Sequence, residues 1–334
     1  MTQAHGADRR SVGRRASSFA ALDLGTNNCR LLVAQPSQGG FRVVDAFSRI
    51  VRLGEGLSRT DRLANAAIER TLAALRVCAG KLRRHDVASL RAVATEACRR
   101  AANCREFLAE VHRDTGIEIE IISAQEEARL ALAGCAPLLD RGVGQAVVFD
   151  IGGGSTEVMW LSVPRSGPPA LADHISVPLG VVTLSERYGG DRVSDEAYQE
   201  MIDVFRGYLE PFDRRYGIAE AVAAGRVQML GTSGTVTTVA GIHFQLPRYD
   251  RSRVDGATIE AAAARAICRD LQGMDFHARS QSPCIGRERA DLVVAGCAVL
   301  EAILDTWAVP RLRIADRGVR EGILVELIGT AGRG

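Results

Sequence analysis

The sequence predicts an α/β fold of two related lobes, with mixed sheets, flanking helices and a cleft between the lobes. Its 334 residues exceed the roughly 100 to 200 residues of one ordinary domain. Short apolar runs broken by Gly, Asn and Ser alternate with stretches of helical periodicity, a succession typical of α/β proteins. An Asp-x-Gly turn between two apolar runs occurs twice, which indicates a duplicated lobe.

The first lobe is expected to open with an antiparallel meander, because FAALD, RLLVA and FRVVDAF are short apolar runs separated by turn residues. Its expected elements are the meander over 19–50, a helix over 61–85, a strand over 90–95, a helix over 103–114 and a strand over 118–122. Asn103 is the expected N-cap of the last of these helices, with Glu106 as its capping-box partner.

The second lobe is expected to repeat this opening. DLGTNNCRLLVA over 23–34 and DIGGGSTEVMWL over 150–161 each place Asp-x-Gly between two apolar strands. The expected elements are a helix over 124–136, two strands around a Gly-rich turn over 145–163, a loop over 164–173, a strand over 174–178, a helix over 195–215, a strand and turn over 227–241, a helix-rich tail interrupted by a loop over 276–286, and a strand, turn and helix over 312–328.

The composition excludes several classes of protein. The formal net charge of +2 is too small for a protein that coats nucleic acid. The eight cysteines form no C-x-x-C pair and the six histidines lack metal-ligand spacing, so we expect reduced thiols and no zinc site. No apolar run reaches the roughly 18 residues that span a bilayer. We therefore expect a cytoplasmic protein with a disordered basic tail over 1–17, or alternatively an anion-attracting arm there.

Three turns rich in Gly and hydroxyl groups are candidates for phosphate binding. Small residues let backbone N–H groups approach a phosphate, and a helix that begins at such a turn adds its N-terminus. One such turn is more often an ordinary hairpin, but two copies in related lobes make a polyphosphate clamp. The predicted phosphate-binding residues are Gly25, Thr26, Asn27, Asn28, Arg30, Gly152, Gly153, Gly154, Ser155, Thr156, Gly231, Thr232, Ser233, Gly234 and Thr235.

Carboxylates at the mouths of the two Asp-x-Gly turns are candidate metal ligands. Asp23 and Asp150 each open one turn, and Glu157 follows the second turn. Oxygen ligands of this kind suit Mg²⁺ or Mn²⁺, which would neutralise substrate phosphates.

Nine separated motifs resemble those of one family. They are DLGTNNCRLLVA, VRLGEGL (51–57), VATEACRRAAN (93–103), AQEEARLALAG (124–134), DIGGGSTE (150–157), PLGVVTLSERYG (178–189), GTSGTVTT (231–238), RERADLVVAG (287–296) and DRGVREG (316–322). In their order and spacing the chain resembles the short, two-lobe form of the exopolyphosphatase and guanosine pentaphosphate phosphohydrolase (Ppx/GppA) family, which belongs to the sugar kinase, heat-shock-70 and actin superfamily.

The resemblance implies two duplicated ribonuclease H-like lobes of the actin-like ATPase type. The first would cover 18–125, completed by a last helix at about 317–334, and the second would cover 126–316. Glu127 would be the general base that activates water for attack on the terminal phosphorus of inorganic polyphosphate or of guanosine pentaphosphate. Its neighbour Glu126 would support it.

The resemblance also implies that Arg99 binds the transferring phosphate, with Arg30 and Arg289 as weaker candidates. The chain departs from the family at Asn28, where Ser is common, and in ATEACR, where ATSALR is usual and Glu96 and Cys98 are substituted. We expect no nucleic-acid or membrane partner, and a homodimer is left open as the assembly.

Two other functions stay open at this point. A kinase of the same superfamily would share both Asp-x-Gly turns but would need an acceptor pocket, and the EEAR segment favours hydrolysis instead. A non-catalytic sensor would bind a guanosine polyphosphate and pass lobe closure to a partner, although the retained Glu127 speaks against it.

Overall fold

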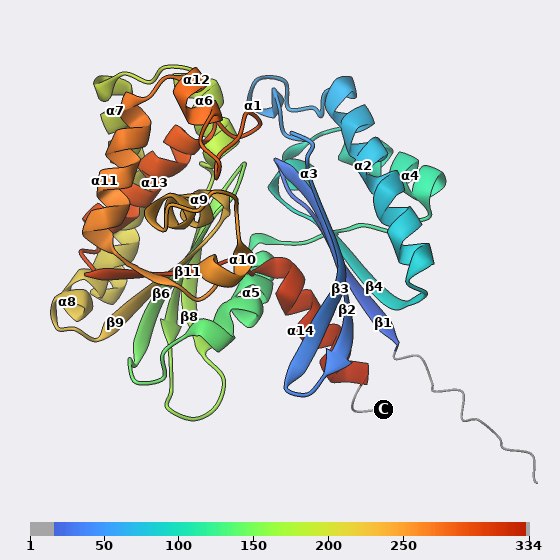
Figure 1. The fold of residues 1–334 in the computed structure, drawn as a ribbon, viewed down its shortest axis with the longest axis horizontal. Helices are drawn as coiled ribbons and strands as arrows, with labels where there is room; N and C mark the ends of the chain where they lie inside the picture. Colours follow the sequence, from blue (N-terminus) through green and yellow to red (C-terminus); the bar gives the residue numbers. More distant parts are fainter. Residues whose placement is uncertain (1–16, 332–334) are drawn as a thin grey trace, which may run out of the picture.

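Two mixed sheets, each covered by helices, make up the computed structural model, which describes residues 17–331 (Figure 1). The basic tail expected over 1–17 lies outside the described residues except for its last position. Within 17–331, we find no helix that combines the length and the apolar character needed to cross a bilayer.

The first lobe contains a five-stranded sheet with the order β3-β2-β1-β4-β5. Its strands are β1 (Ser18–Leu24), β2 (Asn28–Ser37), β3 (Gly40–Ile50), β4 (Val87–Ala94) and β5 (Glu120–Ile121). The first three form the predicted antiparallel meander, and β4 pairs in parallel with β1. Its first helices are α1 (Leu57–Thr60), α2 (Asn65–Arg84), α3 (Glu96–Arg100) and α4 (Cys104–Thr115). Apolar sides of α2 and α4 cover one face of this sheet.

The second lobe contains a six-stranded sheet with the order β10-β11-β9-β6-β7-β8. Its strands are β6 (Gln145–Ile151), β7 (Thr156–Ser162), β8 (Ala170–Val177), β9 (Val227–Thr232), β10 (Thr258–Glu260) and β11 (Arg311–Ala315). Again three strands form an antiparallel meander, and the first of them pairs in parallel with a later strand, β9. The shared strand order confirms the predicted fold of two duplicated α/β lobes.

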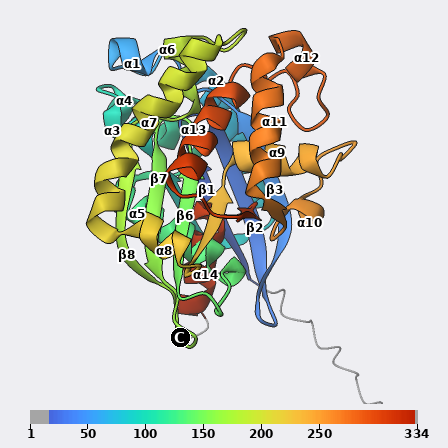
Figure 2. The same ribbon diagram turned by 90° about the vertical axis from the view of Figure 1, so that its left-hand side faces the viewer.

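Helices α7 (Asp195–Tyr216), α13 (Val293–Thr306) and α11 (Ala261–Gly273) lie side by side over the second sheet (Figure 2). The remaining helices of this lobe are α6 (Val181–Tyr188), α8 (Ile218–Ala223), α9 (Gly234–His243), α10 (Arg251–Val254) and α12 (Phe276–Ser280). The apolar sides of α7, α11 and α13 and those of the sheet form one core.

Two helices fill the space between the sheets. They are α5 (Ala124–Cys135), followed by the short 3-10 helix η1 (Ala136–Leu138), and α14 (Val319–Ala331). Both contribute to a core that also takes side chains from the inner faces of both sheets. They cross very closely, because a Cβ on Gly322 would collide with the carbonyl oxygen of Leu130 and one on Gly134 with that of Gly318. Glycine is therefore required where the helices cross.

The predicted capping box at Asn103 is wrong. The side chain of Asn103 makes no capping hydrogen bond; instead its Oδ1 accepts from Leu63 N at 2.8 Å and its Nδ2 donates to Leu63 O at 3.1 Å. Glu106 is exposed and pairs with Arg62. A tertiary contact has taken the polar atoms that a local cap would use.

Several predicted boundaries are also wrong. The helix over 61–85 begins only at Asn65, the strand over 118–122 shrinks to β5, and β8 occupies part of the predicted loop over 164–173. The loop over 276–286 begins with α12, whose N-terminus is capped by the side chain of Asp275. Strand pairing fixes the ends of β5 and β8, and a side-chain cap fixes the start of α12; neither is visible as periodicity.

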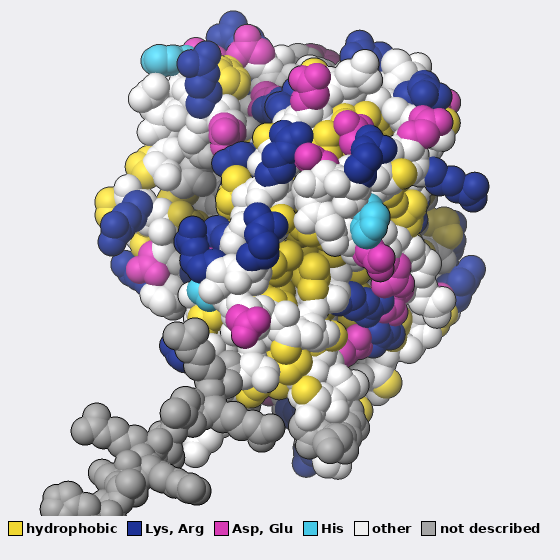
Figure 3. Space-filling model, turned by 90° about the vertical axis from the view of Figure 1, so that its right-hand side faces the viewer, with side chains coloured by type: hydrophobic (Ala, Val, Ile, Leu, Met, Phe, Trp, Pro, Cys, Tyr) yellow, Lys and Arg dark blue, Asp and Glu magenta, His cyan; other side chains and the backbone are white. Residues whose placement is uncertain are grey.

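The outer face of the first lobe is mixed in character (Figure 3). Basic and acidic side chains are interspersed over it, around a strip of hydrophobic side chains in the middle of the view. Such a mixture is ordinary for a protein surface, to which apolar atoms contribute about half of the area.

Candidate active site

A cleft of about 660 Å³ lies between the lobes, and segments of both line it. It takes in all three predicted phosphate-binding turns, which follow β1, β6 and β9. The predicted residues that line it are Asp23, Gly25, Thr26, Asn27, Asn28, Arg30, Glu127, Asp150, Gly152, Gly153, Gly154, Ser155, Thr232, Ser233, Gly234, Thr235 and Arg289.

The two Asp-x-Gly turns have the same backbone hydrogen bond. Gly25 N donates to Asn28 O in the first turn, and Gly152 N donates to Ser155 O in the second, both at 2.9 Å. Each turn reverses the chain between two paired strands, β1 and β2 or β6 and β7. The duplication therefore extends to the geometry of the turns.

The turns of the two lobes pack directly against each other. A Cβ on Gly153 would lie 3.0 Å from Cβ of Thr26, and one on Gly154 would lie 2.7 Å from the Thr26 hydroxyl oxygen. The third turn leads into α9, where Ser233 caps the helix by accepting a hydrogen bond from Val236 N at 3.1 Å. Backbone N–H groups at this helix N-terminus are suited to an anion.

Four predicted site residues do not line the cleft: Arg99, Thr156, Glu157 and Gly231. Gly231 lies within β9 against the ring of Phe149, and the hydroxyl of Thr156 donates to Leu179 O at 2.8 Å. Glu157 is buried behind the second turn, where Ser155 Oγ donates to it at 2.7 Å and Ser176 Oγ at 3.0 Å. The side chains of Thr156 and Glu157 support the second turn from behind.

The two turn aspartates line the cleft, and the pKa of each is raised. Burial raises the pKa of Asp150 to about 7, and the nearby charge of Glu157 adds to that effect. Burial also raises the pKa of Asp23, against the attraction of Arg30 and Arg320. Their charge is therefore costly unless a cation accompanies it.

A hydrated divalent metal ion fits this part of the cleft. Besides the two aspartates, the carboxamide oxygens of Asn27 and Asn28 are buried there and have no hydrogen-bond partner in the described chain. Residues 17–331 hold no cluster of three or more His, Cys, Asp or Glu side chains placed to enclose a metal. Mg²⁺ is commonly held by one or two carboxylates, with water and substrate phosphate completing its shell.

Glu127 lies in the cleft wall at the start of α5. Arg99 Nη1 donates to its Oε2 at 2.8 Å. Burial raises the pKa of Glu127 well above its usual range, and the charge of Glu157 adds to the effect, whereas Arg99 opposes it. A raised pKa suits a general base that works near neutral pH.

Glu126, expected to support Glu127, faces away from the cleft, and that expectation is wrong. Its carboxylate accepts from Arg129 at 2.6 Å and from Arg91 at 2.8 Å. These hydrogen bonds lower the pKa of Glu126 to about 2. Glu126 thus belongs to a surface ion-pair network that also includes Glu326 on α14.

Within the described residues, three arginines line the cleft without a protein partner. Within residues 17–331 the side chains of Arg30, Arg289 and Arg320 make no hydrogen bond or ion pair. Burial, and then the like charge of Arg30, lowers the pKa of Arg289. Such a group attracts a polyanion, because each guanidinium retains its full set of donors. Sequence reasoning missed Arg320, although the DRGVREG motif contains it.

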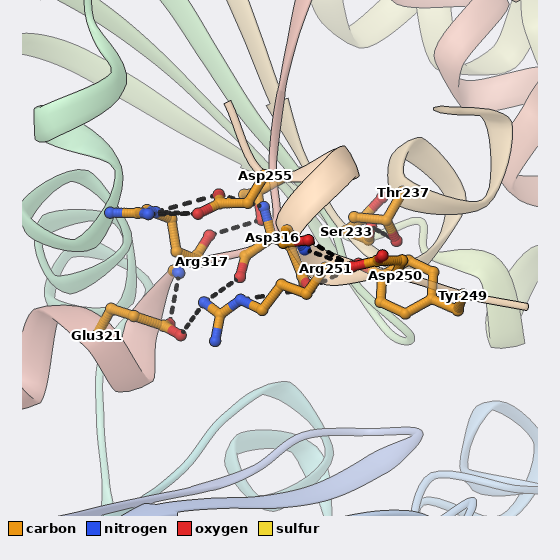
Figure 4. A network of polar contacts seen from close by, with 12 residues as sticks. Ser233, Thr237, Tyr249, Asp250, Arg251, Asp255, Asp316, Arg317 and Glu321 are labelled. Carbon is orange, nitrogen blue, oxygen red and sulfur yellow. Dashed lines mark hydrogen bonds and ion pairs between the residues drawn. The ribbon is translucent and has the colours of Figure 1, made fainter. Parts of the chain in front are cut away.

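A polar network fixes the turn at 316–318, beside the cleft (Figure 4). Arg251 Nη2 donates to Glu321 Oε1 at 2.8 Å and to Asp316 O at 2.5 Å. Tyr249 donates its hydroxyl to Asp316 Oδ2 at 2.6 Å. The network joins the second lobe to the first turn of α14, so it positions the helix that carries Arg320. Neither Tyr249 nor Arg251 gave a signal in the sequence.

A model of the Ppx/GppA phosphatase family matches residues 32–331. The chain belongs to the Ppx/GppA phosphatase family. Among solved structures, the Aquifex aeolicus member of the Ppx/GppA family is 27% identical with a TM-score of 0.76, over 95% of this chain and 99% of that one. An exopolyphosphatase-like protein is 29% identical with a TM-score of 0.84, over 94% of this chain and 98% of that one.

Curated Ppx/GppA relatives are longer than this chain. A protein of Aeromonas hydrophila named guanosine-5'-triphosphate,3'-diphosphate pyrophosphatase is 31% identical over 313 residues, which are 93% of this chain and 59% of that protein. The protein of the same name from Aeromonas salmonicida matches to the same extent. The chain thus spans about three-fifths of the length of these relatives.

Proposed function

We propose that this chain hydrolyses the terminal phosphoanhydride bond of inorganic polyphosphate or of guanosine pentaphosphate. The observation that carries the proposal is the carboxyl of Glu127, which is 13% exposed and hydrogen-bonded to Arg99 in the wall of a cleft lined by the candidate phosphate-binding turns. The names of its relatives, a guanosine pentaphosphate pyrophosphatase and an exopolyphosphatase-like protein, support the same class of reaction.

In this proposal Glu127 is the general base. Its carboxylate takes a proton from a water molecule while the oxygen of that water attacks the terminal phosphorus. The bond from phosphorus to the bridging oxygen breaks, and its electron pair leaves with the shortened phosphate chain. Arg99, to which the resemblance gives a role in binding the transferring phosphate, donates to this base at 2.8 Å. General bases of this kind contribute about 10²- to 10⁴-fold to a rate.

The remaining cleft residues bind and orient the phosphates. Backbone N–H groups of the two Asp-x-Gly turns and of the α9 N-terminus would receive phosphate oxygens, and the unpaired arginines would hold the rest of the polyanion. Asp23 and Asp150 would hold Mg²⁺ or Mn²⁺, with Glu157 behind them. When bound, the metal would neutralise phosphate charge as a Lewis acid.

A panel of substrates tests this function. Phosphate release by the purified chain would be measured with Mg²⁺ on short polyphosphate, long polyphosphate, guanosine pentaphosphate and ATP, each with and without excess EDTA. We expect metal-dependent release from at least one of the first three and little from ATP. Tight binding without any release would contradict hydrolysis and favour a sensor of guanosine polyphosphates.

The proposal leaves the assembly and the cellular location as predictions. A homodimer would double the mass of 35.8 kDa, which light scattering on the purified chain measures directly. A cytoplasmic location would be tested by fractionation of cells that express the chain.

A further inference from the structure

Glu96 is a carboxylate in the cleft wall for which the family resemblance provides no role, since Ser is usual at this position. It is the first residue of α3, and only Thr95 separates it from the end of β4. Its side chain is 16% exposed and lines the cleft next to the second phosphate turn, where a Cβ on Gly154 would lie 3.1 Å from Glu96 Cγ. An extra negative charge therefore stands where a polyanion is expected to bind.

The partner of Glu96 is Arg99, one helical turn further along α3. Arg99 Nε donates to Glu96 Oε2 at 3.1 Å. Nη2 lies 3.0 Å from the same oxygen and is buried without a hydrogen bond of its own. On the other side, Nη1 donates to Glu127 Oε2 at 2.8 Å and to Ile122 O at 3.0 Å. Residues three apart on a helix are placed to meet in this way.

No donor nitrogen of Arg99 is open to the cleft, because Nε and Nη1 donate to protein oxygens and Nη2 is buried beside Glu96. A guanidinium binds phosphate best through two parallel N–H groups on one edge, and Glu96 holds the edge formed by Nε and Nη2. Arg99 itself does not line the cleft, whereas Arg30, Arg289 and Arg320 do and have no partner in the described chain. Burial opposes the charge of Arg99, but the two carboxylates outweigh it and raise its pKa.

We propose that Glu96 locks Arg99 onto Glu127, so that Arg99 is a positioning residue for the base and other arginines of the cleft bind the phosphates. With Ser at this position, the edge formed by Nε and Nη2 would be free to turn toward a phosphate. The substitution thus exchanges one phosphate ligand for a firmly oriented base. The inference rests on the proposed hydrolase function, because it needs Glu127 to act on water.

A double-mutant cycle between positions 96 and 99 tests the lock. The dissociation constant of inorganic tripolyphosphate would be measured by calorimetry in EDTA for the wild type, Arg99→Met, Glu96→Ser and the double variant. We expect Arg99→Met to change affinity by less than about threefold when Glu96 is present, and to weaken it about tenfold in the Glu96→Ser background, the value of one charge-assisted contact. Glu96→Gln, which keeps the shape of the side chain, controls for misfolding.

Steady-state kinetics gives a second readout. We expect Arg99→Met to lower kcat by about 10²-fold with KM within about threefold of the wild type, and Arg99→Lys, which can still pair with Glu127, to restore part of kcat. A loss of affinity of tenfold or more in Arg99→Met with Glu96 intact would overturn the inference, as would equal effects of Arg99→Met in both backgrounds. A wild-type chain that neither binds nor cleaves any phosphate compound would overturn the proposed function and this inference together.

Discussion

Two adjacent glutamates at the start of α5 have opposite surroundings. Successive helical side chains point about 100° apart, so Glu126 meets Arg91 and Arg129 at the surface while Glu127 faces the cleft. The pKa of the first is lowered to about 2, and that of the second is raised well above its usual range. One step along the helix therefore separates a carboxylate in a structural ion pair from a candidate base.

At the same scale, the raised pKa of Asp150 predicts that the Mg²⁺ concentration needed for activity depends on pH. Its pKa of about 7 means that the metal-free chain holds a proton there at lower pH, and a divalent ion must displace that proton. We expect the Mg²⁺ concentration for half-maximal phosphate release to rise about tenfold from about pH 8 to about pH 6. Asp150→Asn should lose most of this dependence. Equal Mg²⁺ requirements at both pH values would contradict the prediction.

The same raised pKa has a consequence for folding. The folded chain holds the proton more firmly than the unfolded chain, so the stability contributed by Asp150 is complete below the ordinary pKa of an aspartate, about 4. It is lost as the pH rises through about 7. Thermal unfolding of metal-free wild type and Asp150→Asn across this window measures the difference.

At the scale of elements, the crossing of α5 and α14 positions two residues of the candidate site relative to each other. α5 carries Glu127 and α14 carries Arg320, and they cross where Gly322 meets the backbone of Leu130. Gly322→Ala must push the helices apart. We expect a loss of about 1 to 3 kcal/mol in the free energy of unfolding and a lower kcat.

Gly80→Ala on α2 is the matched control for this crossing. Nothing lies within 4 Å of a Cβ built at Gly80, so the added methyl should stabilise its helix by about 0.5 to 1 kcal/mol and leave kcat unchanged. Denaturant unfolding of both variants makes the comparison. If both substitutions had the same effect, close helix packing would not be what Gly322 provides.

At the scale of the whole molecule, a set of hydrogen bonds that we call the latch joins the lobes. It links Arg52, Gly56 and Ser58 of the first lobe to Asp291 and Glu186 of the second. Arg52 of the first lobe forms two hydrogen bonds with Asp291 of the second, at 2.8 and 2.9 Å, and Glu186 of α6 accepts from Gly56 N and Ser58 Oγ, both at 2.7 Å. Arg52 N also donates to the carbonyl oxygen of Asn27 in the first phosphate turn. Three family motifs, VRLGEGL, PLGVVTLSERYG and RERADLVVAG, meet in this latch.

We expect Arg52→Met to open the cleft, since it removes the paired charge across the lobes. KM should rise about threefold to tenfold, in keeping with a partly exposed ion pair, and small-angle scattering should report a larger radius of gyration. The control is Arg62→Met, because Arg62 pairs only loosely with Glu106 of its own lobe, at 3.7 Å. An unchanged radius and KM in Arg52→Met would show that the latch does not hold the lobes closed.

The sequence predicted local and repeated features of this molecule better than its tertiary contacts. The duplicated meanders follow from apolar runs and turn residues, and most of the predicted phosphate residues line one cleft because both turns close paired strands. The partners of Asn103, Glu126 and Arg99 could not be predicted, because Leu63, Arg91 and Glu127 lie far from them in the sequence and reach them only through the fold. For the same reason the unpaired state of Arg320 became visible only in the structure.

The role of Glu127 as the base is tested by the rate of phosphate release by Glu127→Gln beside Glu126→Gln, on whichever substrate the wild type cleaves best. We expect a fall of about 10²- to 10⁴-fold for Glu127→Gln, since Gln cannot take a proton from water, and a change of less than about threefold for Glu126→Gln. Undiminished release by Glu127→Gln, or equal losses in the two variants, would contradict the assignment of Glu127 as the base.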